Sequence, residues 1–222
     1  MKVLVACEES QTVTKAFRSI GIEAWSCDIQ DCSGGRPEWH IKGDALREAY
    51  SGKYDLMIGH PPCDFLSKCG GRWLYKGGKK VNGYCPKRTK GRSQAVQFFL
   101  ELWNAPIRFI CLENPADMLV NQPVIVDGVT YKLSDRIPEC TQVVEPFHHG
   151  HGYSKKTGLW LKNLPLLEAT DIVDEYVPYM PSNTGGAKRG HKATPKTMNK
   201  KLASKTFEGI AKAMANQWSL LS

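Results

Sequence analysis

The sequence lacks the apolar run of roughly 18 residues that a membrane-spanning helix needs. Its opening MKVLVACEESQ turns acidic after a short apolar run, which predicts a strand rather than a signal peptide. It also lacks the paired cysteines of a disulfide scaffold, and Cys7, Cys27 and Cys111 lie in apolar, strand-like runs. These absences favour one globular domain of 222 residues in a reducing cytoplasm.

Acidic residues are missing from two long stretches. None lies between Asp64 and Glu101 or between Glu175 and Glu208, whereas lysine and arginine are frequent in both. The chain as a whole carries a formal net charge of +8. Basic blocks without acids indicate a polyanionic partner, most simply nucleic acid. The alternative is a pair of solvated loops.

A glycine-rich phosphate loop is absent as well. Residues 2–7, 14–20 and 23–27 predict a strand, a helix and a second strand that ends at Asp28. An acid at this place binds ribose hydroxyls in Rossmann-like domains, although acids also follow strands as turn residues. The first turn has Cys7, Glu8 and Ser10 where glycines would let the backbone approach a pyrophosphate. A dinucleotide is therefore disfavoured, and a ligand without phosphate stays open.

The remaining pattern predicts an alternation of strands and helices. Strands are expected at 55–59, 107–112 and 158–161. Helices are expected at 46–50, at 93–103 with Ser93 as N-cap, and at 204–218. Residues 34–42 are expected to form a loop, and 124–141 a hairpin around positions 127 and 128. The fold class predicted from this order is α/β.

Two of the predicted strands end in residues that can carry chemistry. The strand at 55–59 stops at a Pro-Pro pair, and Cys63 follows directly, while the strand at 107–112 ends in Glu113 and Asn114. Open α/β sheets bind ligands at the carboxyl ends of their strands, and neighbouring parallel strands would place Glu113 beside Cys63. A cysteine there is either a nucleophile with a lowered thiol pKa or a small apolar filler.

In their order along the chain, these residues resemble the motifs of the DNA (cytosine-5) methyltransferases. Residues 62–67, PCDFLS, are similar to the family's P-C-Q-x-x-S nucleophile loop, with Asp64 in place of glutamine. Glu113-Asn114-Pro115 is similar to the catalytic E-N-V. Residues 149–157 match Y-G-x-P-Q-x-R-x-R more loosely, with only Lys155 keeping the charge, and 207–214 correspond to the last motif, which closes the cofactor pocket.

This resemblance implies the Rossmann-like α/β sheet of the S-adenosylmethionine-dependent methyltransferases, with helices on both faces. It implies transfer of a methyl group from S-adenosylmethionine to C5 of a flipped-out cytosine in double-stranded DNA. Cys63 would add to C6, Glu113 would supply a proton or hydrogen bond at N3, and Asn114 would position this turn. Lys155 completes the predicted catalytic group.

The resemblance also implies which residues bind the cofactor and the nucleic acid. The expected cofactor residues lie at strand tips and before the nucleophile: Ala6, Cys7, Glu8, Ser10, Asp28, Ile29, Asp44, Ala45, His60 and Pro61. The expected nucleic-acid residues lie in or beside the acid-free blocks: Ser67, Lys68, Arg72, Trp73, Lys79, Lys80, Arg88, Arg92, Lys188 and Arg189. No metal is expected, because Cys69, Cys85 and the histidines at 148, 149 and 151 lack the spacing of a zinc site.

The predicted organisation is a catalytic domain over 1–168 with a basic catalytic-loop insertion at 68–91, a small basic lobe over 169–205, and a C-terminal helix over 206–222. Because the lobe stands in place of the family's large target-recognition domain, short or relaxed sequence selectivity is expected. The layout is similar to that of virus- or prophage-borne members, and a monomer is favoured. Two alternatives stay open: the same chemistry on RNA or a free or modified pyrimidine nucleotide, or a nucleic-acid-binding protein without turnover.

Overall fold

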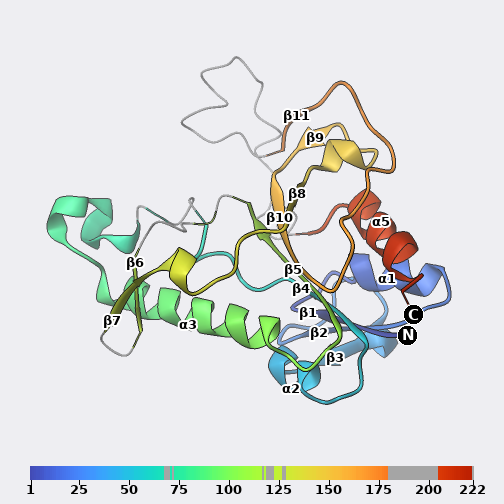
Figure 1. Ribbon diagram of the computed structural model, residues 1–222, viewed down its shortest axis with the longest axis horizontal. Coiled ribbons are helices and arrows are strands. Elements are labelled where there is room, and N and C mark those ends of the chain that lie inside the picture. The colour runs from blue at the N-terminus through green and yellow to red at the C-terminus, as the bar shows by residue number, and fades with distance from the viewer. Residues whose placement is uncertain are drawn as a thin grey trace.

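A seven-stranded sheet runs through the middle of the computed structural model (Figure 1). The structure describes residues 1–67, 71, 73–116, 118, 123–126, 129–179 and 205–221, and only the backbone at 123–126, 131 and 133. The strand order is β3-β2-β1-β4-β5-β10-β8. In chain order the strands of this sheet are β1 (Lys2–Ala6), β2 (Glu23–Asp28), β3 (His40–Lys42), β4 (Leu56–Gly59), β5 (Phe109–Pro115), β8 (Gln142–Val144) and β10 (Thr157–Lys162).

The strands from β3 to β5 are parallel to one another, and β10 runs antiparallel to both of its neighbours, β5 and β8. The first five positions have the order of a doubly wound nucleotide-binding sheet. In such a sheet the chain changes direction between β1 and β4, and ligands bind outside the carboxyl ends of these strands. The predicted Rossmann-like α/β sheet is therefore confirmed.

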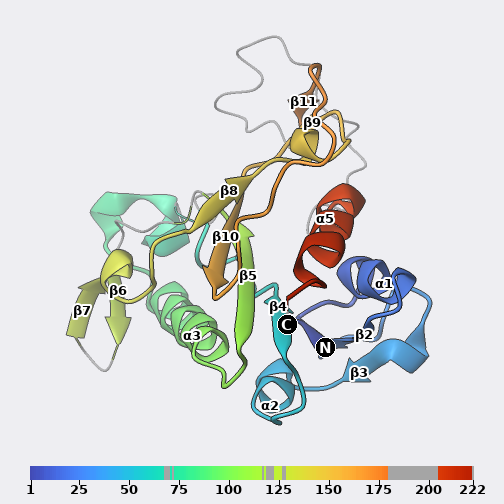
Figure 2. The same ribbon diagram turned by 45° about the vertical axis from the view of Figure 1, so that its right-hand side comes forward.

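Helices cover both faces of this sheet, as predicted. Helices α1 (Thr12–Ser19) and α5 (Glu208–Trp218) pack on one face, and α2 (Ala45–Ala49) and α3 (Pro86–Trp103) on the other (Figure 2). The side chains of β1 alternate between the two hydrophobic cores that result, although all of them are apolar from Val3 onward. A strand that is apolar on both faces is typical of a parallel sheet buried between helices.

Helix α5 carries the end of the chain back to the sheet. Ile210, Met214 and Trp218 repeat every four residues, are at most 2% exposed, and pack in the same core as α1. The indole N–H of Trp218 donates to the carbonyl of Pro165 at 3.2 Å. Because a buried indole N–H needs an acceptor, this bond ties the end of α5 to the loop after β10. The predicted apolar face of the last helix is thereby confirmed.

Helix α3 begins at Pro86 and not at Ser93, which lies in the helix interior. Proline suits the first helical position, because its fixed φ is helical and its missing N–H would have no partner there. The two turns that follow are polar and basic, so the apolar periodicity starts only beyond them. Residues 86–91, predicted as the end of the basic insertion, are the first turns of α3.

Two predictions about strands are also corrected. Residues 34–42, predicted as a loop, contain a 3₁₀ turn at Pro37–Trp39 and the strand β3, which pairs with the end of β2. Strand β5 does not end before Glu113 but continues to Pro115, because β10 pairs along it with Leu159 opposite Glu113. The backbone of Glu113 is thus held by hydrogen bonding within the sheet.

The outer segments form two small sheets. Strands β6 (Pro123–Val126) and β7 (Val129–Lys132) are the predicted antiparallel hairpin, and β9 (Tyr153–Ser154) pairs in parallel with β11 (Val177–Pro178). Positions 180–204 of the predicted basic lobe lie outside the described residues. Within the residues that are described, no helix is both long and apolar enough to cross a membrane.

Candidate active site

His60 and Glu113 meet at the tips of two neighbouring parallel strands. The last residue of β4, Gly59, pairs with Leu112 of β5, so the residue that follows each of them reaches the same edge of the sheet. His60 Nδ1 lies 3.0 Å from Glu113 Oε2, and the two side chains are only 16% and 12% exposed. The sequence predicted His60 as a cofactor residue and gave no sign of this pairing.

The two groups of this pair stabilise each other's charged forms. Burial alone would raise the pKa of Glu113, but the hydrogen bond and charge of His60, together with Lys155, lower it to about 2. Burial alone would lower the pKa of His60, but Glu113 and, more weakly, Glu8 raise it above its usual value. Both shifts favour an imidazolium paired with a carboxylate.

Thr206 adds a second hydrogen bond to the same carboxylate. Its hydroxyl donates to Glu113 Oε2 at 2.9 Å from the segment that leads into α5. Among the described residues, the hydrogen bonds of the carboxylate end on Oε2, so Oε1 is left for a ligand. Thr206 is separated from Glu113 by 93 residues, and no local sequence pattern could have indicated this contact.

Cys63 lies in a turn directly after the Pro-Pro pair. The backbone N–H groups of Leu66 and Ser67 donate to the carbonyl of Cys63 at 3.0 and 2.9 Å, which closes the turn. Burial, and then the charges of Asp64 and Glu113, raise the pKa of the half-buried thiol, whereas Lys155 lowers it. The structure thus brings Cys63 into the electrostatic reach of Glu113 and Lys155, as the order of the strands predicts.

Asn114 connects this turn to β5. Its side chain is 3% exposed, and Nδ2 donates to the carbonyl of Pro61 at 2.8 Å and to that of Glu113 at 3.1 Å. One amide group therefore fixes the turn that carries Cys63 against the strand that carries Glu113. This geometry suits the positioning role predicted for Asn114.

Lys155 reaches the site from the segment between β9 and β10. Its backbone N–H donates to Glu145 Oε2 at 2.8 Å, and the Ser154 hydroxyl donates to the same oxygen at 3.2 Å. Glu145 is only 7% exposed, and its role was not predicted. The ammonium group of Lys155 lies 5.9 Å from the centre of the Phe207 ring, next to Thr206 in sequence. The charge of Lys155 lowers the pKa of both Cys63 and Glu113.

Two arginines of α3 that are predicted to bind nucleic acid contact the turn of Cys63. Arg92 is 1% exposed, donates to the carbonyl of Phe65 at 2.9 Å, and has a pKa lowered to about 10 by burial and by Arg88. Arg88 donates to the carbonyl of Asp64, and its guanidinium lies 4.2 Å from the centre of the Phe65 ring. Ser67 is also buried, at 6% exposure, so its hydroxyl does not face solvent where a phosphate would bind.

The turn between β1 and α1 lacks glycines, and a buried acid, Glu8, binds the start of α1. Glu8 accepts from the N–H groups of Val13 and Thr14 at 2.7 and 3.3 Å and from the Thr14 hydroxyl at 2.7 Å. These N–H groups at the start of α1 are the ones that would bind a phosphate in a dinucleotide-binding domain. Glu8 is 4% exposed, and both of its carboxylate oxygens accept hydrogen bonds from the start of α1.

Gln11 fastens a neighbouring loop over the same turn. Its side-chain amide donates to the carbonyl of Arg36 at 2.7 Å and accepts from the N–H of Arg36 at 3.0 Å. Cys7 and Gln11 both have positive φ, 60° and 58°, in the turn where glycine was expected. Ser10, at 9% exposure, is 3.3 Å from the Thr12 hydroxyl. The backbone turn is therefore made by other residues, at some conformational strain.

Asp28 is the last residue of β2, the neighbour of β1, and Asp44 lies just before α2. Both charges act on the thiol of Cys7, whose pKa is raised mainly by burial. Asp28 Oδ1 accepts from the N–H of Gln30 at 2.9 Å, and Asp44 Oδ1 caps α2 by accepting from Leu46 at 2.9 Å. In the described part of the chain each acid keeps its second oxygen for a ligand.

The other predicted cofactor residues divide into one exposed and several buried side chains. Ile29 follows Asp28 and is 78% exposed, which is unusual for isoleucine. Ala6 and Ala45 are buried in the core under this edge, and Pro61 is buried and uses its carbonyl to bind Asn114. Their side chains therefore support the edge rather than present themselves to solvent.

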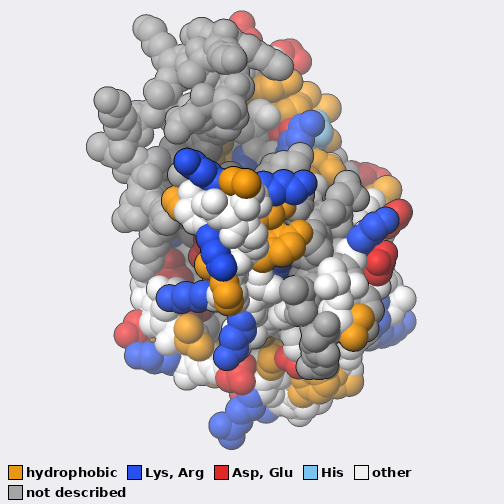
Figure 3. Space-filling model, turned by 90° about the vertical axis from the view of Figure 1, so that its left-hand side faces the viewer, with side chains coloured by type: hydrophobic (Ala, Val, Ile, Leu, Met, Phe, Trp, Pro, Cys, Tyr) orange, Lys and Arg blue, Asp and Glu red, His pale blue; other side chains and the backbone are white. Residues whose placement is uncertain are grey.

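The segment before α3 presents basic and aromatic side chains to solvent. Trp73 is 50% exposed, and Lys79 and Lys80 are exposed. The rings of Tyr75 and Tyr84 stack with their centres 5.1 Å apart. Figure 3 shows Lys and Arg side chains on this face of the molecule. Four other residues predicted to bind nucleic acid, Lys68, Arg72, Lys188 and Arg189, lie outside the described residues.

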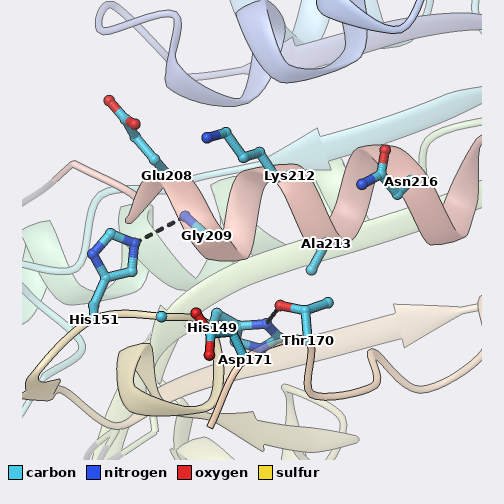
Figure 4. A pocket seen from close by; sticks show the side chains of 10 residues that line it. His149, His151, Thr170, Asp171, Glu208, Gly209, Lys212, Ala213 and Asn216 are labelled. Atoms are coloured by element: carbon cyan, nitrogen blue, oxygen red, sulfur yellow. Dashed lines mark hydrogen bonds between the residues drawn. The ribbon is translucent and has the colours of Figure 1, made fainter. Parts of the chain in front are cut away.

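A separate hollow of about 380 Å³ lies against the first turns of α5. Figure 4 shows His149, Thr170 and Asp171 along one side of it and His151 at the start of the helix. His149 Nδ1 is 3.1 Å from the Thr170 hydroxyl, and His151 Nε2 accepts from the N–H of Gly209 at 2.9 Å. In the described part of the chain, no group of three or more His, Cys, Asp or Glu side chains could hold a metal ion.

Comparisons with known proteins find only weak similarity to solved structures. No family model matches it, and neither does a curated protein. Three solved structures resemble it weakly, at TM-scores of 0.38, 0.41 and 0.36. They are a DNA modification methyltransferase encoded within an E. coli prophage (12% identity), the Entamoeba histolytica methyltransferase EhMeth (15%) and WbdD (15%). The matches cover 72%, 83% and 85% of this chain but only 46%, 61% and 36% of those chains. Similarity this low does not identify a family.

Proposed function

We propose that this protein transfers a methyl group from S-adenosylmethionine to C5 of cytosine in double-stranded DNA. The observation that supports the proposal is that Cys63 follows β4 while Glu113 lies in the neighbouring β5, and the buried amide of Asn114 donates to the carbonyls of Pro61 and Glu113. Cytosine C5 is a poor nucleophile until a thiolate adds at C6, and a proton at N3 favours this addition. A thiol and a carboxyl group on one side of a site are what that chemistry requires.

The residues of the site would then act in sequence. Cys63 loses its thiol proton to solvent, which Lys155 favours, and its sulfur forms a bond to C6. Electrons move from the C5–C6 double bond towards N3, which takes a proton from the carboxyl group of Glu113. After C5 has gained the methyl group, its hydrogen leaves as a proton to solvent. The sulfur–C6 bond then breaks, and N3 returns its proton.

The cofactor edge fits a ligand that has ribose hydroxyls but no phosphate. Asp28 and Asp44 each keep one carboxylate oxygen, and the exposed Ile29 can pack against a flat ring. His60 Nε2 is buried and has no hydrogen-bond partner among the described residues. These residues would hold S-adenosylmethionine, which supplies an electrophilic sulfonium methyl group. A phosphate is disfavoured because Glu8 occupies the start of α1.

DNA is proposed as the substrate because the site lies beside a basic, aromatic surface. A base must leave the duplex before its C6 atom can be reached, and the phosphates must be held meanwhile. The exposed Lys79, Lys80 and Trp73 offer positive charge and a stacking ring for this purpose. Such a surface carries no code for a base sequence, so weak sequence selectivity is expected.

The direct test is methyl transfer from labelled cofactor to DNA, RNA and dCMP, with 5-methylcytosine identified by mass spectrometry. We expect product on DNA, and a loss of activity of roughly 1,000-fold or more in Cys63→Ala, because the covalent step is removed. Cys32→Ala, at another half-buried cysteine, should keep wild-type activity. Equal activity in Cys63→Ala would exclude the thiol mechanism, and product on RNA or dCMP alone would reassign the substrate.

A further inference from the structure

His60 is surrounded by charged groups from three other parts of the fold. Glu113 contacts its Nδ1 from β5, Glu8 acts on it from the turn before α1, and Lys155 opposes them from the segment before β10. Cys63 follows three residues later in the same turn. The imidazole thus lies among Glu113, Glu8 and Lys155.

The proposed function needs a proton donor at Glu113, but this carboxyl group is ionised in the resting protein. Its Oε2 accepts from both His60 and Thr206, at 3.0 and 2.9 Å. Hydrogen bonds to a carboxylate favour its charged form, and the imidazolium adds a full positive charge. In an imidazolium–carboxylate pair, the proton between the two groups is on Nδ1 of His60, 3.0 Å from Glu113 Oε2.

We propose that His60 stores the proton that Glu113 passes to N3 of the target cytosine. This inference rests on the proposed function. As the Cys63 sulfur bonds to C6, the proton moves from Nδ1 to the Glu113 carboxyl group and on to N3, leaving His60 neutral. When the sulfur–C6 bond breaks, the proton returns by the same route, so that His60 ends the cycle charged. His60 acts through Glu113 and is therefore a positioning residue.

Two substitutions separate this role from simple hydrogen bonding. Asn in place of His60 keeps an N–H group near the position of Nδ1, facing Glu113, and Gln keeps one near the position of Nε2. Neither amide can hold a transferable proton. If His60 only orients Glu113 through Nδ1, H60N should keep the activity of the wild type. If His60 only binds the cofactor through Nε2, H60Q should keep it. Under the proposal both variants lose kcat and retain their KM for DNA.

The pH profile gives the most specific signature. In the wild type the donor form is protonated His60, so activity is expected to persist until the pH rises through the raised pKa of the pair. Without the imidazolium, burial raises the pKa of Glu113, and the donor becomes its own acid form. In H60N and H60Q the alkaline limb therefore moves to lower pH, with kcat reduced about 100-fold at pH 8 and far less at pH 6.

A cofactor-free readout checks the same step. Exchange of the cytosine C5 hydrogen with solvent deuterium needs addition at C6 and protonation at N3 but no methyl transfer. We expect exchange in the wild type, none in Cys63→Ala, and about 100-fold slower exchange at pH 8 in both His60 variants. Unchanged exchange and an unchanged pH profile in H60N would overturn the inference.

The pair can also be observed without substrate. Titration of isotope-labelled imidazoles by NMR should show His60 protonated beyond the usual histidine range, and Glu113→Gln should remove this shift while the other five histidine signals stay in place. A His60 signal that ignores Glu113→Gln would overturn the inference. A wild type that methylates and exchanges no cytosine would instead overturn the proposed function, whatever the NMR titration shows.

Discussion

Asn114 is the residue on which the geometry of the site depends most directly. Its amide hydrogens bind the carbonyls of Pro61 and Glu113, so a single side chain sets the distance between two strand tips. The side chain is buried, and a carbonyl that loses its donor in such a place is not rehydrated. Stability and alignment therefore depend on the same two bonds.

Replacing Asn114 by alanine should lower the free energy of unfolding by about 1–3 kcal/mol, because the buried Pro61 carbonyl is left without a donor. Methyl transfer should fall as well, since the turn of Cys63 is no longer fixed against β5. Urea unfolding monitored by fluorescence measures the first effect. Asn216→Ala, at an exposed position on α5, is the control and should change stability little. A loss no larger in N114A than in this control would contradict the role given to Asn114.

At the scale of elements, the start of α5 contacts both the central sheet and the loop that contains His149 and His151. Thr206 reaches Glu113, Phe207 contacts the rings of His151 and Tyr179 with centres 5.1 and 4.8 Å away, and Gly209 donates to His151. The helix can approach the loop at His149 because position 209 has no side chain. A Cβ there would overlap the backbone carbonyl of His149.

Gly209→Ala is therefore expected to destabilise the protein by about 1–3 kcal/mol in spite of the better helix propensity of alanine. The helix start must shift, and the Thr206–Glu113 hydrogen bond should lengthen with it. Thermal unfolding and the His60 titration described above report the two effects. Gly43→Ala is the matched control, because nothing lies within 4 Å of a Cβ at that position. Equal melting temperatures for the two variants would refute this account of the start of α5.

At the scale of the whole molecule, positive charge is distributed unevenly around the sheet. The exposed lysines at 76, 79, 80, 87 and 90 belong to α3 and the segment before it. Helix α1 covers the opposite face of the sheet and exposes Lys15. A duplex held by phosphate contacts should therefore approach from the α3 side, where Trp73 is also exposed.

Changing Lys79 and Lys80 together to alanine should weaken DNA binding at every sequence and reduce the slope of log K against log salt by about 1 for each lost contact. Fluorescence anisotropy with a labelled duplex at several salt concentrations measures both quantities. Lys15→Ala removes one positive charge on the α1 side and is expected to leave the slope unchanged. If all of these variants bind DNA like the wild type, the duplex does not contact this surface.

The sequence by itself determined the alternation of strands and helices and placed Cys63 and Glu113 at the edge of the sheet where β4 ends. Apolar runs that end in Pro-Pro or in Glu-Asn are local signals, and parallel pairing of β4 with β5 then places their ends together. The same local signals located the apolar face of α5. These signals did not predict the start of α3 or the strand β3, because polar residues there interrupt the apolar periodicity.

Only the tertiary structure decided what the charged side chains contact. Arg92, expected on phosphate, is buried behind the turn of Cys63, and Glu8, expected on a cofactor, caps α1. His60 pairs with Glu113, and Thr206 joins them from the far end of the chain. Burial and long-range hydrogen bonds depend on how elements pack, which residue type and spacing do not record. The motif thus gives the positions of Cys63 and Glu113, and packing sets which groups contact them.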